Sequence, residues 1–245
     1  MKKMAWITGI LLCAMMVLSA LGSVGNAVWQ IAVDETFYSE QSRAAVKAAM
    51  GYETEEEVTA YIGLTPEEQK SFAGSMSAYM LDENQSVELP SYLSEDEARH
   101  MDDVRRLVRL ARELGKGCMT MGAALAVAAA WTGSRLKKRG KTILAGLVSG
   151  EAVIALVVMN VVHALKSGGF AQMFTGMHEM LFTNDLWLMN PAEDILIRIM
   201  PQPLFEQAML NGAVMALRMF LIVWILLLVV YEIVSRMIRR HVAKD

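Results

Sequence analysis

The chain has 245 residues, of which 54% are hydrophobic and 20% are charged, and its formal net charge at pH 7 is -3. The hydrophobic fraction exceeds the ~45–50% that is usual for a soluble globular domain, so the composition favours a membrane protein. A negative net charge without a basic stripe argues against a nucleic-acid partner, because nucleic-acid binding needs clustered Lys and Arg side chains.

The N-terminal segment is long enough to cross a membrane. No charged side chain occurs from Met4 to Val33, directly after Lys2 and Lys3. This run is longer than the ~7–15 apolar residues of a signal peptide, and it reaches the ~20 residues that span a bilayer. We predict an uncleaved transmembrane helix over residues 4–28.

The polar segment that follows predicts a helical domain over residues 34–116. Ser or Thr is followed three residues later by Glu at three places, which is the pattern of a capping box at a helix start. These pairs are Thr54 with Glu57, Thr65 with Glu68, and Ser94 with Glu97. The segment carries few large apolar side chains, so we expect it to rest on the membrane helices.

The helix that starts near Ser94 carries the first candidate catalytic residue. His100 falls on one apolar face by the 3.6-residue period, and the other members of this face are Val104, Leu107, Ala111 and Leu114. Asp103 is its neighbour at i+3. We expect the arginines at 105, 106, 109 and 112 to face solvent or lipid headgroups.

The remaining chain predicts three more spans. Residues 117–134, 142–165 and 212–234 form these helices, and residues 135–141 and 235–245 form a basic loop and a basic tail. The sequence therefore predicts an all-α integral membrane fold with four transmembrane helices. A helical domain lies between helices 1 and 2, and a re-entrant or surface-lying helical loop, residues 166–211, lies between helices 3 and 4.

The distribution of basic residues predicts the orientation in the plasma membrane. Lys and Arg are enriched in short cytoplasmic loops. The basic N-terminus, loop and tail fall on one side of a four-span topology. We expect a multi-pass protein with both termini in the cytoplasm, so that residues 34–116 and 166–211 share the outer compartment.

The loop over residues 166–211 carries the second candidate catalytic residue. His178 lies four residues from Phe174 and from Phe182, again on an apolar helical face. We expect Trp187 to be an interfacial anchor and Asn190-Pro191 to start a short helix that runs to Met200. Candidate orienting groups for the histidines are Asp103, Asn184, Asp185 and Asp194.

Two histidines on inward-facing helical surfaces in one compartment can form an acid/base pair. The alternative for each histidine is a core residue with satisfied hydrogen bonds. A metal-dependent hydrolase that uses His100, His178 and Glu179 has acceptable ligand types but little support from spacing. A membrane subunit without enzymatic activity is the third possibility.

Two charged residues lie inside predicted spans. Glu151 and Arg218 fall at similar depths in helices 3 and 4. A charge at the bilayer centre is unfavourable by ~2.5–3.5 kcal/mol on insertion scales. We predict that they form an intramembrane polar pair, and the alternative is that Arg218 extends outward to lipid phosphates.

Three segments resemble one family of four-span bacterial membrane proteins. They are HMDDVRRL around His100, HEMLFTNDLWLMNPAEDILIRIMPQPLF from His178, and EEVTAYIGLTPEEQKSFAGSMSAYML in the outer domain. This pattern is similar to the lipoprotein intramolecular transacylase family, Lit. The two histidine blocks carry most of the specificity.

The resemblance implies an enzyme that moves the sn-2 acyl chain of a diacylglyceryl-cysteine lipoprotein to the cysteine α-amine. It also implies that His100 and His178 are the catalytic pair, acting at the outer leaflet. The partners would be diacylglyceryl-modified lipoproteins and membrane lipids. We expect a monomer that needs no cofactor and no metal. Because amine and ester belong to one substrate molecule, no enzyme nucleophile is required, and proximity supplies a large effective molarity.

Overall fold

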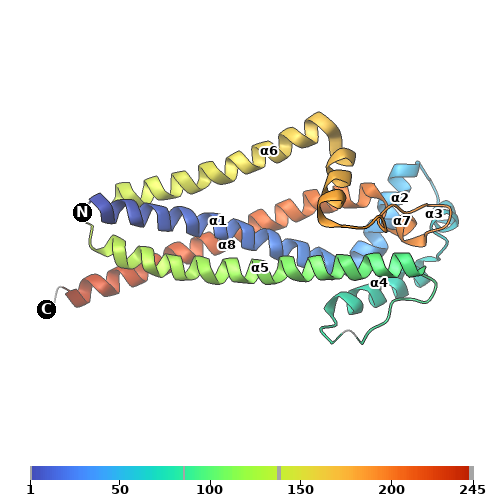
Figure 1. Cartoon of the computed structure of the whole chain (residues 1–245), viewed down its shortest axis with the longest axis horizontal. Helices are drawn as coiled ribbons and strands as arrows, with labels where there is room; N and C mark the ends of the chain where they lie inside the picture. Colours follow the sequence, from blue (N-terminus) through green and yellow to red (C-terminus); the bar gives the residue numbers. More distant parts are fainter. Residues whose placement is uncertain (1, 85, 137–138, 243–245) are drawn as a thin grey trace. The chain divides into compact units, whose positions relative to one another are not determined.

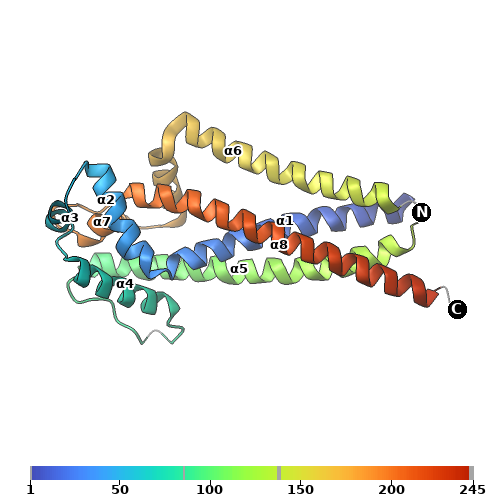
Figure 2. The same ribbon diagram turned by 180° about the vertical axis from the view of Figure 1, so that it is seen from behind.

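The computed structural model describes residues 2–84, 86–136 and 139–242, except for the side chains at 139, 161–162 and 164–168. All regular structure in these residues is helical (Figures 1 and 2). The elements in chain order are α1 (Lys2–Ala32), the π-helical turn η1 (Phe37–Gln41), α2 (Ser42–Met50), α3 (Glu55–Ile62), α4 (Pro66–Leu81), α5 (Glu95–Ser134), α6 (Arg139–Leu181), α7 (Ile195–Ile199) and α8 (Gln202–Val242).

In the described part of the chain, four helices are long and apolar enough to cross a membrane. The qualifying stretches are Lys2–Ala32, Glu95–Ser134, Gly140–Asn160 and Gln202–His241. The predicted all-α, four-span fold is therefore confirmed. Residues 117–134, the predicted second span, are the charge-free part of α5.

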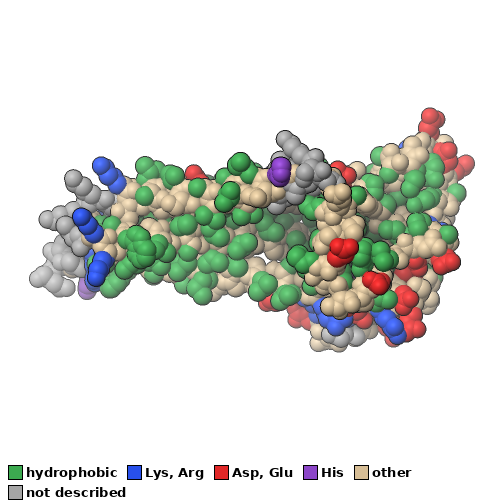
Figure 3. Space-filling model, turned by 45° about the horizontal axis from the view of Figure 1, so that its top comes forward, with side chains coloured by type: hydrophobic (Ala, Val, Ile, Leu, Met, Phe, Trp, Pro, Cys, Tyr) green, Lys and Arg blue, Asp and Glu red, His purple; other side chains and the backbone are tan. Residues whose placement is uncertain are grey.

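The chain divides into two compact units, and each of the four long helices contributes to both. The membrane unit consists of Met1–Ala27, Arg112–Ala164 and Ala213–Asp245, and the head unit consists of Val28–Ala111 and Leu165–Gly212. Hydrophobic side chains cover most of the visible surface of the membrane unit, whereas acidic side chains are frequent on the head unit (Figure 3).

Small residues allow the helices of the membrane unit to pack closely. Ala126, Ala129 and Ala130 of α5 are fully buried against α1 and α8. At Gly146 of α6, a Cβ atom would lie 2.8 Å from the carbonyl oxygen of Gly9, so α1 and α6 could not approach this closely with a larger residue. Without a hydrophobic driving force between helices in lipid, close packing of this kind is what holds them together.

The head unit is built around a mixed apolar and aromatic core. Buried residues from η1, α2, α3, α4, α5, α7 and α8 form one cluster, with Phe72, Met76 and Ile199 at its centre. All three predicted capping boxes are formed, at Thr54, Thr65 and Ser94. They fix where α3, α4 and α5 begin.

Helix α5 differs from its prediction in two ways. The predicted domain boundary at residues 116 and 117 falls inside one continuous helix, Glu95–Ser134. The buried residues of its head half are Glu97, His100, Met101, Arg105 and Val108, whereas Val104 and Leu107 of the predicted face are half-buried. The predicted face is therefore right at His100 and misses Arg105, whose side chain is buried through contacts that a hydrophobic period does not detect.

Helix α6 bends at Gly169, inside the part of the helix that belongs to the head unit (Figure 1). Gly169 has φ of 69° and ψ of 173°, which a residue with a side chain rarely adopts, so glycine is required at this bend. The continuation ends at Leu181 and carries His178. The expected helix start at Asn190 is wrong: residues 191–193 form a turn, and α7 begins at Ile195.

Candidate active site

His100 of α5 and His178 of α6 lie next to each other in the head unit. Their ring centroids are 6.2 Å apart, and the ring planes are inclined by 23°. The side chains are only 7% and 8% exposed. Two helices that are distant in sequence therefore bring both imidazoles to one largely dehydrated place.

A main-chain hydrogen bond fixes the orientation of His178. Its Nδ1 lies 2.7 Å from the carbonyl oxygen of Phe174, one helical turn earlier. Only a protonated Nδ1 can donate to this oxygen, so in the neutral ring the lone pair is on Nε2. The helix itself thus sets the tautomer that leaves Nε2 free to accept a proton.

Aromatic side chains surround the two imidazoles. The ring of Phe174 lies 4.2 Å from that of His178, and Trp187 lies 5.1 Å from it. Phe182 contacts both histidines, at 5.0 Å from His100 and 5.4 Å from His178. Trp187 is therefore part of the site. The sequence had suggested that it is an interfacial anchor, and this contact with His178 was not expected. Phe174, His178 and Phe182 are spaced at four-residue intervals, and this spacing is the sequence signal for the aromatic contacts of His178.

His100 is held in its neutral form. Burial lowers its pKa from 6.5 to about 4; repulsion from a positive charge on His178 acts in the same direction, and Asp103 opposes it. Its Nδ1 is buried without a hydrogen-bond partner among the described residues. His100 therefore stays uncharged near neutral pH.

Asp103 contacts the loop after α6 and not the ring of His100. Its carboxylate accepts a hydrogen bond of 2.9 Å from Nδ2 of Asn184 and forms an ion pair with Arg106. Oδ1 of Asn184 accepts from the backbone N–H of Leu186 at 3.2 Å. These bonds attach the loop that carries Trp187 to the helix that carries His100.

The other candidate residues lie outside this contact network. Asp185 is exposed in a turn, and Asp194 accepts a hydrogen bond of 2.7 Å from the backbone N–H of Asn190. Glu179 is exposed. Within residues 2–84, 86–136 and 139–242, no group of three or more His, Cys, Asp or Glu side chains could hold a metal ion. The hydrolase alternative thus has no ligand set in this part of the chain.

Glu97, one turn before His100, connects two helices, a role that the sequence does not indicate. Its carboxylate is 2% exposed and accepts from the backbone N–H of Ser94 and from that of Leu196, each at 2.7 Å. The capping-box pattern predicted the first bond, but nothing local in the sequence indicates the second.

Two predictions about charged residues have different outcomes. Glu151 and Arg218 are both exposed in the membrane unit, and the described residues show no ion pair between them; their pairing stays a prediction. Arg105 was expected on a solvated surface, and this is wrong. Its guanidinium lies 4.0 Å from the ring centroid of Tyr79 and pairs with Asp102 at 2.8 Å.

Comparison with known families matches residues 9–205 to the model described as lipoprotein intramolecular transacylase Lit. The chain belongs to the Lit family. Membership supports an enzyme with an acyltransferase role. A search of curated proteins gives no match.

Solved structures of a Lit protein have a similar fold. The integral membrane Lit of Bacillus cereus superposes with a TM-score of 0.62 and 16% identity, over 98% of this chain and 100% of that one. Two variants of that protein, in which a histidine is replaced by arginine or by alanine, give TM-scores of 0.60 at 16% identity. They cover 98% of this chain and 96% and 97% of theirs. At this identity the likeness shows the fold, which is that of a multi-pass membrane protein.

Proposed function

We propose that this Lit-family protein moves the sn-2 acyl chain of a diacylglyceryl-cysteine lipoprotein to the α-amine of the same cysteine. The observation that carries the proposal is the buried pair of His100 and His178, with ring centroids 6.2 Å apart. The family match supplies the reaction class. The reaction forms an amide bond, breaks the sn-2 ester bond and leaves a hydroxyl on the glyceryl group.

His178 suits the role of proton carrier. Its Nδ1–H is held by the carbonyl of Phe174, so Nε2 is free to take the proton that the amine loses as it attacks the ester carbon. The imidazolium formed in this way then protonates the glyceryl oxygen as the C–O bond breaks. One proton leaves the nitrogen and one arrives at the oxygen, so the step is balanced without an enzyme nucleophile.

His100 suits the role of a neutral hydrogen-bond donor. Its pKa of about 4 keeps the ring uncharged near neutral pH, and its Nδ1 is enclosed by protein. We assign the proton of the neutral ring to Nε2, where it can donate to the ester oxygen on which negative charge develops. A neutral donor also avoids repulsion with His178 when that ring becomes positively charged.

The surroundings favour acyl transfer over hydrolysis. Phe174, Phe182 and Trp187 cover the faces of the imidazoles and limit the access of water. The nucleophile and the ester are tethered within one substrate molecule, so holding them near each other supplies much of the rate acceleration. The proposal places the site at the outer leaflet, which the basic loop and termini support through the enrichment of Lys and Arg on the cytoplasmic side.

The test is direct analysis of the product. Purified protein would be incubated with a synthetic diacylglyceryl-cysteine peptide, and tandem mass spectrometry would locate each acyl chain. We expect one chain on the cysteine nitrogen and one on the glyceryl group, at an unchanged total mass. Release of free fatty acid with no N-acyl peptide would indicate a hydrolase and would reject the proposal.

A further inference from the structure

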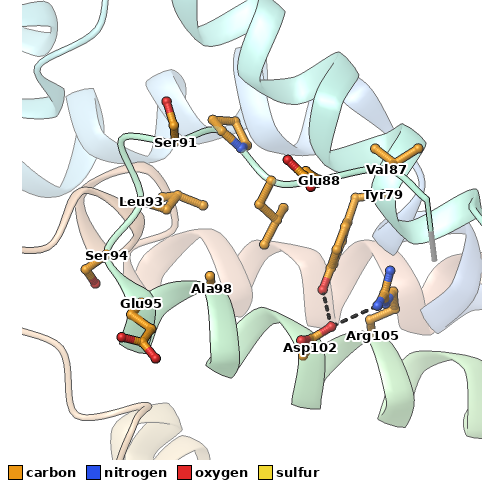
Figure 4. Close-up of a pocket in the computed structure, with 12 residues that line it drawn as sticks. Tyr79, Val87, Glu88, Ser91, Leu93, Ser94, Glu95, Ala98, Asp102 and Arg105 are labelled. Carbon is orange, nitrogen blue, oxygen red and sulfur yellow. Dashed lines mark hydrogen bonds and ion pairs between the residues drawn. The ribbon is translucent and has the colours of Figure 1, made fainter.

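A pocket of about 410 Å³ lies in the head unit between α5 and the extended segment that precedes it (Figure 4). Helix α5 lines the pocket with Ala98, Asp102 and Arg105, which share one face at intervals of four and three residues. At 100° per residue, His100 points about 200° away from Ala98. The pocket is therefore on the opposite side of α5 from the histidine pair.

The lining combines apolar walls with excess negative charge. Val87, Leu89, Pro90 and Leu93 provide apolar surface. Glu88, Glu95 and Asp102 supply three carboxylates to the lining, and Arg105 supplies its one guanidinium. Asp102 is paired with Arg105, and Glu95 forms an exposed ion pair with Arg99, which does not line the pocket. An acidic ligand or an anionic lipid headgroup would be repelled, whereas a chain with apolar and basic side chains fits both features.

Arg105 offers a hydrogen-bond donor that the head unit does not use. The residue is 7% exposed and is held by the Tyr79 ring and by Asp102, whose carboxylate also accepts from the Tyr79 hydroxyl at 2.5 Å (Figure 4). Its Nη1 has no hydrogen-bond partner in the described residues. A buried donor of this kind favours a ligand that brings a carbonyl oxygen.

The segment opposite α5 presents unpaired backbone. Residues 86–90 have no regular secondary structure and run along the pocket (Figure 4). Among the described residues, no hydrogen bond reaches the backbone N–H or C=O of Glu88 or Leu89. Free main-chain groups along an extended segment are what a second extended chain pairs with when it binds by strand addition.

We propose that this pocket binds the polypeptide of the substrate lipoprotein shortly after its modified cysteine. This inference rests on the proposed function. A helix with its side chains is ~10–12 Å wide, and an extended chain advances ~3.3–3.6 Å per residue. A chain that starts at the histidines must pass around half the circumference of α5, about 16–19 Å. It therefore reaches the pocket about four to six residues after the cysteine, where its carbonyl oxygens face Arg105 and its side chains face Glu88 and Glu95.

The experiment compares diacylglyceryl-cysteine peptides that differ only in charge. One peptide carries Lys at the fourth to sixth residues after the cysteine, another carries Glu there, and two more carry the same charges near their C-terminus. With purified full-length protein, we expect a kcat/KM roughly fivefold higher for the proximal Lys peptide than for the proximal Glu peptide, the size that exposed ion pairs allow. The distal pair should show no preference.

Variants of the protein then assign the preference to the pocket. Glu88→Lys combined with Glu95→Lys should invert it, whereas Asp96→Lys should preserve it, because Asp96 is an exposed acid on the same turn of α5 that does not line the pocket. Arg105→Gln should raise KM for every peptide and change kcat little. If that variant does not fold, the variant that combines Glu88→Lys and Glu95→Lys still tests whether the pocket sets the charge preference. Equal use of all four peptides by an active wild-type protein would overturn the inference and leave the proposed function intact. Absence of N-acylation with every peptide would instead reject the function itself.

Discussion

The carboxylate of Glu97 accepts a hydrogen bond of 2.7 Å from the backbone N–H of Leu196, although the two residues are 99 positions apart in the sequence. The same carboxylate caps the start of α5 at Ser94. Leu196 lies in the first turn of α7, where backbone N–H groups lack partners within the helix. Glu97 therefore joins the first turns of two helices, and His100 follows one turn later.

Removal of this carboxylate should loosen the site as a whole. Glu97→Ala leaves two backbone donors without a partner, and each hydrogen bond to a charged group contributes about 1.5–3 kcal/mol. We expect a clearly lower midpoint in thermal unfolding of the detergent-solubilised protein, with a smaller change for Glu97→Gln, which keeps one acceptor. Glu95→Ala is the control, since that residue is exposed. A Glu97→Ala protein that unfolds like wild type would show that the two bonds do not stabilise the head unit.

The two histidines should behave as one unit in kinetics. General acid–base groups contribute about 10²–10⁴-fold, so His100→Asn or His178→Asn should nearly abolish N-acylated product. The double variant should lose little more than either single variant, because residues that act together are not additive.

His163→Asn is the matched control for this prediction. His163 is exposed in the membrane unit, so its replacement should leave most activity. Protein level is measured in parallel by immunoblot. Parallel losses of protein and product would point to structural histidines, and full activity of the double variant would refute the mechanism.

Asp103 and Asn184 should be coupled through their shared hydrogen bond. Asp103→Ala and Asn184→Ala each remove the hydrogen bond that attaches the loop carrying Trp187 to α5, so each should lower kcat by an intermediate factor, of the order of tenfold. In a double-mutant cycle the combined loss should be smaller than the product of the two single losses. Independent effects of the two changes would mean that this bond does not position the loop. Asp185→Asn serves as the control, because that exposed side chain is outside the contact network.

The low pKa of His100 predicts a specific loss of stability in acid. The folded-state value of about 4 lies below the usual 6.5, so the unfolded chain binds a proton first as the pH falls. This residue should not affect stability above about pH 6.5, and its contribution should become increasingly unfavourable between pH 6.5 and 4. Thermal unfolding at pH 7.5 and pH 5 should show a smaller acid shift for His100→Gln than for wild type. An equal shift in both proteins would contradict a buried, neutral His100.

The proposed orientation can be tested by labelling single cysteines from outside the cell. Cys13 and Cys118 are the only cysteines and can be replaced. A cysteine at Ser86 should react with an impermeant maleimide in intact cells. A cysteine at Lys138, which lies outside the described residues, should react only after the membrane is permeabilised. The reverse pattern would overturn the orientation and the outer-leaflet placement.

Features that depend on neighbouring residues could be predicted from the sequence. The long apolar stretches predicted the four spans, because the length of an apolar run is compared directly with the bilayer thickness. The capping boxes at Thr54, Thr65 and Ser94 predicted helix starts, because each bond closes within three residues. The four-residue spacing around His178 and the period around His100 indicated that both rings point away from water.

Contacts between distant parts of the chain became visible in the folded structure alone. The ring centroids of His100 and His178 lie 6.2 Å apart in the folded chain. Asp103 accepts a hydrogen bond from Asn184, and Arg105 is buried against the ring of Tyr79. Glu97 has a second partner in Leu196. The physical reason is that a charged side chain enters a core only where hydrogen bonds and an aromatic face compensate for lost hydration, and those partners lie tens of residues away. A hydrophobic period depends only on the residue types along one helix, so it contains no information about such partners.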